Sequence, residues 1–394
     1  MKQELSQKVR VLFFAWGDSI HARRRIGIFC EDSAFEVGVI STFRYDFANA
    51  KNYYLSAADL KLKGQRIRRL LFDPILAIRY ARRFKPDVIF LQTLIYPNYL
   101  SFLLPRKVPM MVTFWNGDVT WWAQWTGIER AFKKQIVLYG TRRAAAITVN
   151  SKAAFEACLG YGAAKERVNL IRYPGVNLDT FRPSGDKSGV RERLGVRHGK
   201  VVLCPRGLGG YLNSDIIIEA AAMVVERMPE VLFLFISGVD SEALKQEHLK
   251  RAEELGIVSH IRMDGQVPWD SMPSYYQAAD AMVSISSNDS LPNCMLEAMA
   301  CGIPVVMGDI PQIREWVEDG INGFLVPPRD PVSLAERLIA TIADSDRIVE
   351  KFVGRNIEMV KREVDSKVMS SRIKELVRKV AMRTAHTGDG VEHG

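Results

Sequence analysis

The chain lacks long hydrophobic runs and any regular arrangement of cysteines. No apolar stretch in its 394 residues approaches the roughly 18 consecutive residues that a membrane-spanning helix requires. The N-terminus is polar and leads at once into a predicted strand, which is not the pattern of a signal peptide. The five cysteines are odd in number and never spaced as Cys-x-x-Cys, so we predict neither a disulfide framework nor a zinc site. We therefore expect reduced thiols and a cytoplasmic protein.

Glycine is scarce where a dinucleotide-binding motif would need it. The loop after the first predicted strand, residues 9–14, contains a single glycine, Gly17, whereas the dinucleotide fingerprint has three. We therefore expect no nicotinamide cofactor. One glycine at this place still lets the backbone approach a ligand closely.

Acidic residues are scarce in one part of a basic chain. The formal net charge is +9, and residues 61–85 contain nine lysines and arginines but only one acid, Asp73. Apolar residues recur among these cations at helical spacing, which predicts an amphipathic helix over residues 64–84. Its basic face could simply be solvated, or it could attract anionic lipid head groups or a phosphorylated acceptor. No nucleic-acid-binding motif accompanies the charge, so we do not expect nucleic acid as a partner.

Apolar runs of strand length alternate with helical patterns in both halves of the chain. The predicted strands of the first half are residues 9–14, 35–40, 86–91, 109–114, 145–149 and 168–171. Those of the second half are residues 201–204, 231–236, 261–263, 281–285 and 304–307. This alternation predicts two doubly wound α/β domains.

A polar linker rich in turn residues, at 183–189, sets the predicted domain boundary. We predict an N-terminal domain over residues 1–183 and a C-terminal domain over residues 184–365. A C-terminal helix is predicted at residues 366–383. The last residues, 384–394, are expected to be a disordered tail.

The most informative stretch is residues 286–306, which predicts a loop, a short helix and a buried strand. Ser290 is predicted to cap the helix, Pro292 to lie in its first turn, and Gly302 to end it. Asp289 and Glu297 place two carboxylates at the carboxyl end of a strand, where ligands bind in open parallel sheets. Carboxylates in such a place commonly accept sugar hydroxyls. Taken singly, Asp289 could also be a helix cap and Glu297 a solvated residue.

The segment from Glu297 to Val306, with residues 315 and 319–326, resembles the donor-site signature of retaining GT-B glycosyltransferases of family 4. Arg206, residues 275–280 and the turn at residues 175–181 agree with the same family. The resemblance implies two Rossmann-like domains that face each other across a cleft, with the C-terminal helix packing back on the N-terminal domain. It also implies a nucleotide-sugar donor held mainly by the C-terminal domain and an acceptor held mainly by the N-terminal domain.

Site residues follow from the resemblance, position by position. Glu297 matches the glutamate that accepts the ribose hydroxyls, and Asp289 matches the first acid of the family's pair, near the donor sugar. Arg206 matches the arginine that binds the diphosphate, where a guanidinium neutralises charge on the leaving group. The resemblance thus makes Arg206 and Asp289 catalytic candidates. His21 is a third, on the acceptor side.

The remaining residues implied by the resemblance line the two ligands. The donor-binding set also contains Gly17, Ser290, Leu291 and Asn293. Asp118 and Trp115 follow the fourth strand of the first half and would lie on the acceptor side. The family needs neither a metal ion nor a cofactor, which agrees with the lack of an Asp-x-Asp motif in this sequence.

Several positions depart from the family pattern. The first acid is Asp289 instead of glutamate, which shortens its reach by one methylene. The lysine usually found several residues after the arginine is missing, so the diphosphate site has one cation fewer. Pro292 stands in a segment where the family has glycine and phenylalanine, and it offers no N–H to the donor. Trp115 and Asn116 occupy the place of a frequent histidine.

The resemblance predicts a retaining hexosyl-type transferase (EC 2.4) that moves a sugar from a nucleotide diphosphate to an acceptor hydroxyl. The basic helix suggests a lipid-linked or saccharide acceptor in cell-surface polysaccharide or glycolipid assembly, with the protein peripheral on the inner face of the cytoplasmic membrane. One alternative is a GT-B sugar-nucleotide epimerase or phosphorylase, which shares the donor site. The other is a basic binding protein whose donor site has degenerated.

Overall fold

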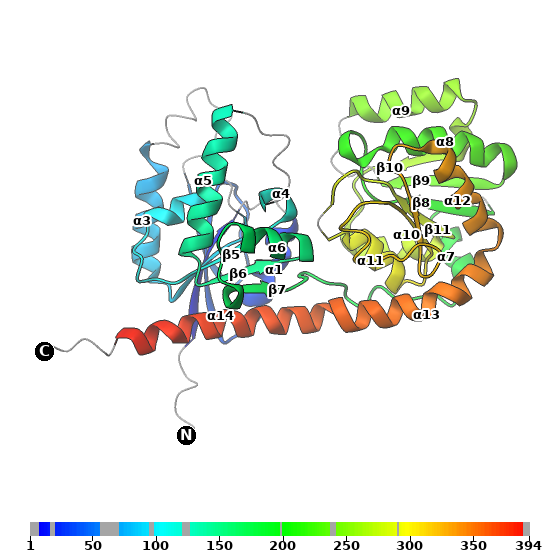
Figure 1. The fold of residues 1–394 in the computed structure, drawn as a ribbon. Helices are drawn as coiled ribbons and strands as arrows, with labels where there is room; N and C mark the ends of the chain where they lie inside the picture. Colours follow the sequence, from blue (N-terminus) through cyan, green and yellow to red (C-terminus); the bar gives the residue numbers. More distant parts are fainter. Residues whose placement is uncertain are drawn as a thin grey trace, which may run out of the picture. The chain divides into compact units, whose positions relative to one another are not determined.

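The structure is a computed structural model that describes residues 8–15, 20–55, 71–93, 98–119, 127–197, 199–236, 242–289 and 291–388. It divides into two units (Figure 1). Unit 1 contains residues 1–174 and 367–394, and unit 2 contains residues 175–366. The boundary after Pro174 lies nine residues before the predicted one at 183. The reason is a pair of backbone hydrogen bonds, Val176 N–H to Val364 O (2.8 Å) and Ser366 N–H to Val176 O (2.9 Å), which tie the start of this segment to unit 2.

Unit 1 is built on a parallel sheet of seven strands in the order β3-β2-β1-β4-β5-β6-β7. The strands are β1 Val9–Ala15, β2 Phe35–Ser41, β3 Ala50–Tyr54, β4 Val88–Leu91, β5 Met110–Phe114, β6 Ala146–Val149 and β7 Val168–Leu170. All of them except β3 were predicted. This edge strand escaped notice because none of its residues is fully buried, so its sequence has no apolar run.

Helices cover both faces of this sheet. They are α1 Ile20–Cys30, α3 Asp73–Phe84, α4 Asn116–Val119, α5 Gly127–Arg143, α6 Lys152–Gly160 and α14 Ser366–Gly388, with 3-10 turns η2 Asn98–Leu103 and η3 Lys165–Arg167. On one face, α14 buries Met369, Ile373 and Val377 together with Phe29 of α1 against the sheet. The C-terminal helix therefore packs back on the N-terminal domain, as the resemblance implied. The other face is covered by residues of α3, α5 and α6.

Two predicted segments differ in extent from the structure. The basic amphipathic helix, predicted over residues 64–84, is described only from residue 71, and α3 begins at Asp73 with a proline in its first turn. Residues 56–70 lie outside the described part. At the other end of the chain, α14 continues to Gly388, five residues beyond the predicted end at 383. Of the tail predicted to be disordered, residues 389–394 lie outside the described residues.

Unit 2 is built on a parallel sheet of six strands in the order β10-β9-β8-β11-β12-β13. The strands are β8 Lys200–Cys204, β9 Val231–Ile236, β10 Ile261–Asp264, β11 Ala281–Ser284, β12 Val305–Gly308 and β13 Phe324–Val326. Its helices are α7 Lys187–Arg193, α8 Ser214–Arg227, α9 Glu242–Glu254, α10 Met272–Ala278, α11 Asn293–Ala300, α12 Pro331–Ala343 and α13 Ser345–Val364, with 3-10 turns η4 Gly210–Leu212, η5 Val258–His260 and η6 Trp269–Ser271. Side chains of α10 and α11 bury one face of the sheet, and those of α8 and α12 bury the other. This is the doubly wound arrangement that the alternation predicts.

Helix α11 begins differently from the prediction. Pro292 occupies the N-cap position, so the first turn starts at Asn293, and the cap makes no side-chain hydrogen bond. The predicted cap, Ser290, lies outside the described residues. The helix ends as predicted, because Gly302 adopts φ +76°, a conformation that glycine tolerates without strain.

In the part of the chain that the structure describes, no helix combines the length and the apolarity needed to cross a membrane.

Candidate active site

The carboxyl edge of the unit 2 sheet brings Arg206 and Asp289 together. Arg206 follows β8 and Asp289 lies in the loop after β11, and these two strands are neighbours in the sheet. The Arg206 Nη1 donates to Asp289 Oδ2 at 2.8 Å, with the Asp289 side chain 8% exposed and that of Arg206 25% exposed. Burial is the largest single influence on the pKa of the Arg206 guanidinium and lowers it, but Asp289, Cys294 and Tyr211 together outweigh burial and raise the pKa. Arg206 is therefore a permanent cation whose orientation is set by Asp289.

Glu297 is a buried carboxylate on α11, not a solvated residue. Its side chain is 6% exposed. The Tyr276 hydroxyl donates to Glu297 Oε2 at 3.0 Å, and Trp269 Nε1 donates to Oε1 at 3.5 Å. Burial, together with the Glu297 charge, raises the pKa of Tyr276 well above its ordinary value. Tyr276 therefore remains a hydrogen-bond donor and holds Glu297 in one orientation.

Cys294 lies among these groups and was not singled out from the sequence. It is buried on the first turn of α11. Burial raises the pKa of its thiol to about 12, although the nearby Arg206 guanidinium acts to lower it. The thiol is therefore protonated at neutral pH and is unsuited to act as a nucleophile.

Two further donor-site candidates flank the start of α11. Leu291 is buried and packs in the hydrophobic core of unit 2. Asn293 has a buried Oδ1 that finds no hydrogen-bond partner among the described residues. A buried amide oxygen without a partner is rare in proteins and is available to a bound ligand or water.

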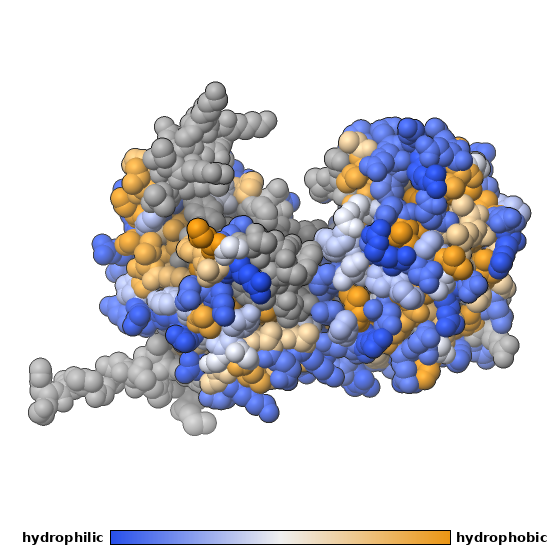
Figure 2. Space-filling view, turned by 45° about the horizontal axis from the view of Figure 1, so that its top comes forward, coloured by the Kyte–Doolittle hydropathy of each residue, from blue (hydrophilic) through white to orange (hydrophobic). Residues whose placement is uncertain are grey.

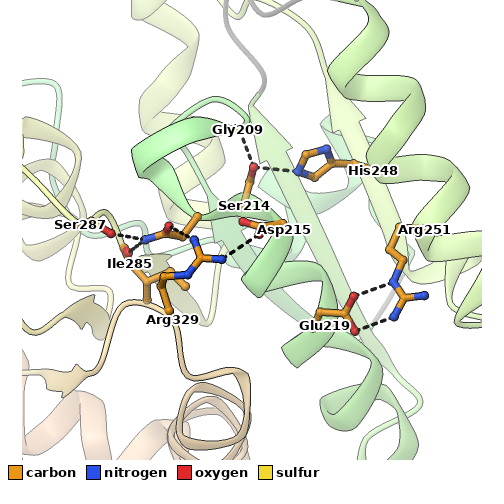
Figure 3. Close-up of polar contacts among 10 residues, drawn as sticks. Gly209, Ser214, Asp215, Glu219, His248, Arg251, Ile285, Ser287 and Arg329 are labelled. Atoms are coloured by element: carbon orange, nitrogen blue, oxygen red, sulfur yellow. Dashed lines mark hydrogen bonds and ion pairs between the residues drawn. The ribbon is translucent and has the colours of Figure 1, made fainter. Parts of the chain in front are cut away.

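The loop between β8 and α8 is tied to α9 by a chain of hydrogen bonds that the sequence did not indicate (Figure 3). Gly209 N–H donates to Ser214 Oγ at 2.6 Å, and Ser214 Oγ lies 2.8 Å from His248 Nε2. His248 Nδ1 lies 2.8 Å from the carbonyl oxygen of Leu244. A carbonyl can only accept, so Nδ1 carries the proton and Nε2 accepts from the Ser214 hydroxyl. The buried pair Ser214 and His248 thus holds the loop that follows Arg206.

Asn213 ties the same loop to the loop after β11. Its Nδ2 donates to Ile285 O and to Ser287 Oγ, each at 2.8 Å (Figure 3). The backbone of Asn213 is left-handed, with φ +54°, a conformation that asparagine adopts more readily than most residues. Arg329 Nη1 in turn donates to Asn213 Oδ1 at 3.3 Å. Hydrogen bonds of Asn213, one of them from the Arg329 guanidinium, therefore order the segment in which the family usually has a lysine.

In unit 1, the acceptor-side candidates Trp115 and Asp118 lie together after β5. Asp118 accepts from the Thr93 hydroxyl (3.0 Å) and from the Trp115 backbone N–H (2.9 Å), and Trp115 Nε1 donates to Gln92 O (2.7 Å). Burial raises the pKa of Asp118 to about 6, against the lowering effect of the N–H and hydroxyl donors. These contacts join the ends of the adjacent strands β4 and β5. Gly17 and the side chain of His21 lie outside the described residues.

A buried polar group beside these residues was missed by the sequence reasoning. Arg25 of α1 is 2% exposed and donates to Thr113 Oγ1 at 2.6 Å. Its guanidinium lies 5.6 Å from the ring centre of Trp115 and 4.9 Å from that of Tyr173. An arginine on a helix normally predicts a solvated face, so only the fold could reveal it. Across the described residues, no group of three or more His, Cys, Asp or Glu side chains is placed to hold a metal ion.

Comparison with protein families assigns both halves of the chain. The family described as "Glycosyltransferase Family 4" matches residues 30–180, and the one described as "Glycosyl transferases group 1" matches residues 191–356. The D-inositol 3-phosphate glycosyltransferase 1 of Catenulispora acidiphila is 34% identical over 201 residues, which cover 49% of this chain and 48% of that protein. The corresponding enzyme of Geodermatophilus obscurus is 38% identical over 192 residues, covering 46% and 42%. The chain spans about half the length of the curated relatives it matches.

Solved structures share the fold over nearly the whole chain. The structure of HepE from Anabaena in complex with UDP and glucose superposes with a TM-score of 0.76 at 20% identity, covering 94% of this chain and 100% of that one. The sucrose-phosphate synthase of Thermosynechococcus elongatus gives a TM-score of 0.76 at 17% identity, covering 95% and 99%. These likenesses show the GT-B fold. With both of its halves matched, the chain belongs to the family 4 glycosyltransferases of the GT-B fold.

Proposed function

We propose that the protein transfers a hexose-type sugar from a nucleotide diphosphate to an acceptor hydroxyl, with retention of anomeric configuration and without a metal ion. The observation that carries this proposal is the arrangement of Arg206 and Glu297 at one edge of the unit 2 sheet. There a permanent cation, held by Asp289, and a buried carboxylate, held by Tyr276, are available for the two polar ends of a nucleoside diphosphate. HepE of Anabaena, which has the same fold, has been crystallised with UDP-glucose.

Glu297 suits the ribose end of the donor. A carboxylate offers about four acceptor positions, and Tyr276 and Trp269 each donate to one of its two oxygens. Its orientation is set before the ligand arrives, which lowers the entropic cost of binding two adjacent hydroxyls.

Arg206 suits the diphosphate end. A guanidinium has five N–H donors. One of those on Nη1 bonds Asp289 Oδ2, and the guanidinium also bonds the Cys294 thiol. In this proposal Asp289 orients the arginine, and the remaining donors stabilise the negative charge that develops on the leaving group. The shorter aspartate thus has a role that the family's glutamate need not share.

The acceptor hydroxyl would be deprotonated by the leaving diphosphate on the same face of the sugar. This front-face route needs no protein nucleophile. The Cys294 thiol bonds Arg206, and its raised pKa argues against a role as nucleophile.

For the acceptor, we propose a lipid-linked or saccharide molecule in cell-surface polysaccharide or glycolipid assembly, reached at the inner face of the cytoplasmic membrane. The basic outer face of α3 supports a peripheral location, because cations attract anionic lipid. A phosphorylated polyol is a second candidate. It is favoured by the names of the relatives, which are D-inositol 3-phosphate glycosyltransferases.

The first test is a panel of nucleotide sugars, scored by the rise in melting temperature that binding produces. The stabilising donor is then incubated with candidate acceptors, and the products are analysed for the new linkage and its anomeric form. Acceptor-dependent consumption of donor, abolished by Glu297→Ala in a folded protein, is the expected result. Donor conversion without acceptor would favour an epimerase or phosphorylase, and tight binding without any conversion would favour a degenerate binding protein.

A further inference from the structure

A cavity of about 490 Å³ lies at the amino edge of the unit 1 sheet. It is bounded by the C-terminal half of α3, the start of β4 and the loop before β5. Trp115 and Asp118 lie beyond the opposite ends of β4 and β5, at Leu91 and Phe114. The cavity is therefore distinct from the acceptor-side candidates, and its volume is within the range of about 300–1,000 Å³ that small-molecule sites occupy.

The walls of the cavity are apolar. They are formed by Ile78, Ala81, Pro86, Ile89, Leu104, Pro105 and Val108. Several of these residues belong to the hydrophobic core beneath α3, so the apolar lining is continuous with the core. Such a surface favours a hydrocarbon ligand, because burial of apolar area is the main source of its binding energy.

The other lining residues are all cations. Arg82 and Lys85 come from the end of α3, and Lys107 comes from the loop before β5. All three are exposed, and no acid lines the cavity within the described residues. Asp87, the nearest acid along the chain, accepts the backbone N–H of Arg10 on β1 at 2.7 Å. The charge around the cavity is therefore of one sign.

The cavity is preformed. Arg143 of α5 donates to the backbone carbonyls of Arg106 (3.3 Å), Pro105 (3.2 Å) and Val108 (3.4 Å), which fixes the loop on one side. On the other side, the backbone N–H of Lys85 donates to Ala81 O at 2.8 Å and closes the end of α3. A ligand would not have to order either wall.

Exposed hydrophobic side chains also lie at the start of α3, the helix whose C-terminal half bounds the cavity. Leu71 and Phe72 precede the helix and Ile75 lies in its first turn, and they are 56%, 54% and 64% exposed. Figure 2 shows hydrophobic atoms gathered on the side of unit 1 where Figure 1 places α3. Apolar side chains next to cations on one helix face are typical of helices that lie at a bilayer surface.

We propose that this cavity binds an anionic amphiphile, with a hydrocarbon chain against the apolar walls and a phosphate-type head group against Arg82, Lys85 and Lys107. The occupant is an anionic phospholipid of a bilayer surface. A free anion would leave the apolar walls unused, and an uncharged chain would leave the three cations unpaired. The site lies apart from the proposed sugar transfer, and its test requires no donor or acceptor.

The direct test uses the full-length protein and dodecyl phosphate below its micellar concentration, measured by titration calorimetry. Ala81→Phe fills the cavity while leaving every charge in place, and Lys107→Glu reverses one lining cation in an exposed loop. Each is expected to weaken binding at least tenfold. Arg79→Glu is the matched control, because it lies on the same helix and makes the same change of charge without lining the cavity. It should alter the dissociation constant less than threefold.

Three results would overturn the proposal. One is binding by inorganic phosphate or by an uncharged dodecyl maltoside as tightly as by dodecyl phosphate. The second is wild-type affinity in a folded Ala81→Phe protein, or in Lys107→Glu if the first variant fails to fold. The third is equal co-sedimentation of the wild type with vesicles of phosphatidylglycerol and of phosphatidylcholine, since only the former supplies an anionic lipid.

Discussion

Replacing Glu297 by glutamine tests the proposed ribose site with little disturbance of the fold. The substitution keeps the shape of the side chain and removes one acceptor oxygen and the charge. The carbonyl of the new amide can still accept from the Tyr276 hydroxyl, now 3.0 Å from Oε2. The amide nitrogen would then face Trp269 Nε1, but that contact is 3.5 Å long and contributes little. We therefore expect Glu297→Gln to fold.

The expected loss of affinity follows from the bonds that the carboxylate would make. A hydrogen bond to a charged group contributes about 1.5–3 kcal/mol. Removing one such bond to a ribose hydroxyl corresponds to a roughly 10- to 150-fold rise in the dissociation constant. Glu297→Ala removes both bonds and should bind no nucleotide measurably, in line with the loss of transfer proposed for it.

The assay is titration calorimetry with the nucleoside diphosphate that most stabilises the protein. Glu318→Gln is the matched control, because Glu318 is a carboxylate of the same unit with a 61% exposed side chain. The control should leave the dissociation constant unchanged within twofold. An affinity for Glu297→Gln equal to that of the wild type, in a protein that melts normally, would refute the assignment of Glu297 to the ribose.

Three further predictions concern the groups that support the site. Ser214→Ala leaves the Gly209 N–H without its acceptor and His248 Nε2 without its donor, so the free energy of unfolding measured in urea should fall by about 2–4 kcal/mol. A fall of less than about 0.5 kcal/mol would mean that this chain of hydrogen bonds does not form. Asp280→Ala removes a 7% exposed carboxylate that is paired with Arg191 and Lys187, and should lower the free energy of unfolding by about 3–5 kcal/mol. A free energy of unfolding close to that of the wild type would show that these ion pairs contribute nothing to stability. The pKa of Asp118 is raised to about 6 by burial, so its contribution to the free energy of unfolding falls as pH rises from about 4 to about 6. In urea titrations, the free energy of unfolding of Asp118→Asn relative to that of the wild type should therefore be higher at pH 7 than at pH 4. An equal difference between the two proteins at both pH values would contradict this.

The fold could be predicted from the sequence because its signals are local. Strands such as β1 and β9 are continuous apolar runs, and both were predicted close to their observed bounds. The errors arose where the local signal was weak or ambiguous. The edge strand β3 has no buried residue to mark it, and Pro292 is compatible both with a first turn and with a cap.

The contacts of the site could not be predicted in the same way, because they depend on the order of strands in the sheet. Arg206 and Asp289 are 83 residues apart, and they meet because β8 lies between β9 and β11. The alternation of strands and helices does not specify that order. The resemblance to the family identified Glu297 as a site residue, but it did not identify Tyr276 and Trp269, which donate hydrogen bonds to Glu297. The pair Ser214 and His248 belongs to no motif and was visible only in the structure.

Two departures from the family pattern, the aspartate at 289 and the missing lysine, are parts of one arrangement. Without the lysine, Arg206 is the cation that Asp289 engages, and the two form an ion pair at 2.8 Å. Because that pair is close to neutral, a diphosphate must share the guanidinium with Asp289 instead of meeting two free cations. Sharing is possible only if the loop that follows Arg206 keeps its position when the ligand arrives. Ser214, His248 and Asn213 supply that constraint through a network of hydrogen bonds, one of which comes from the Arg329 guanidinium.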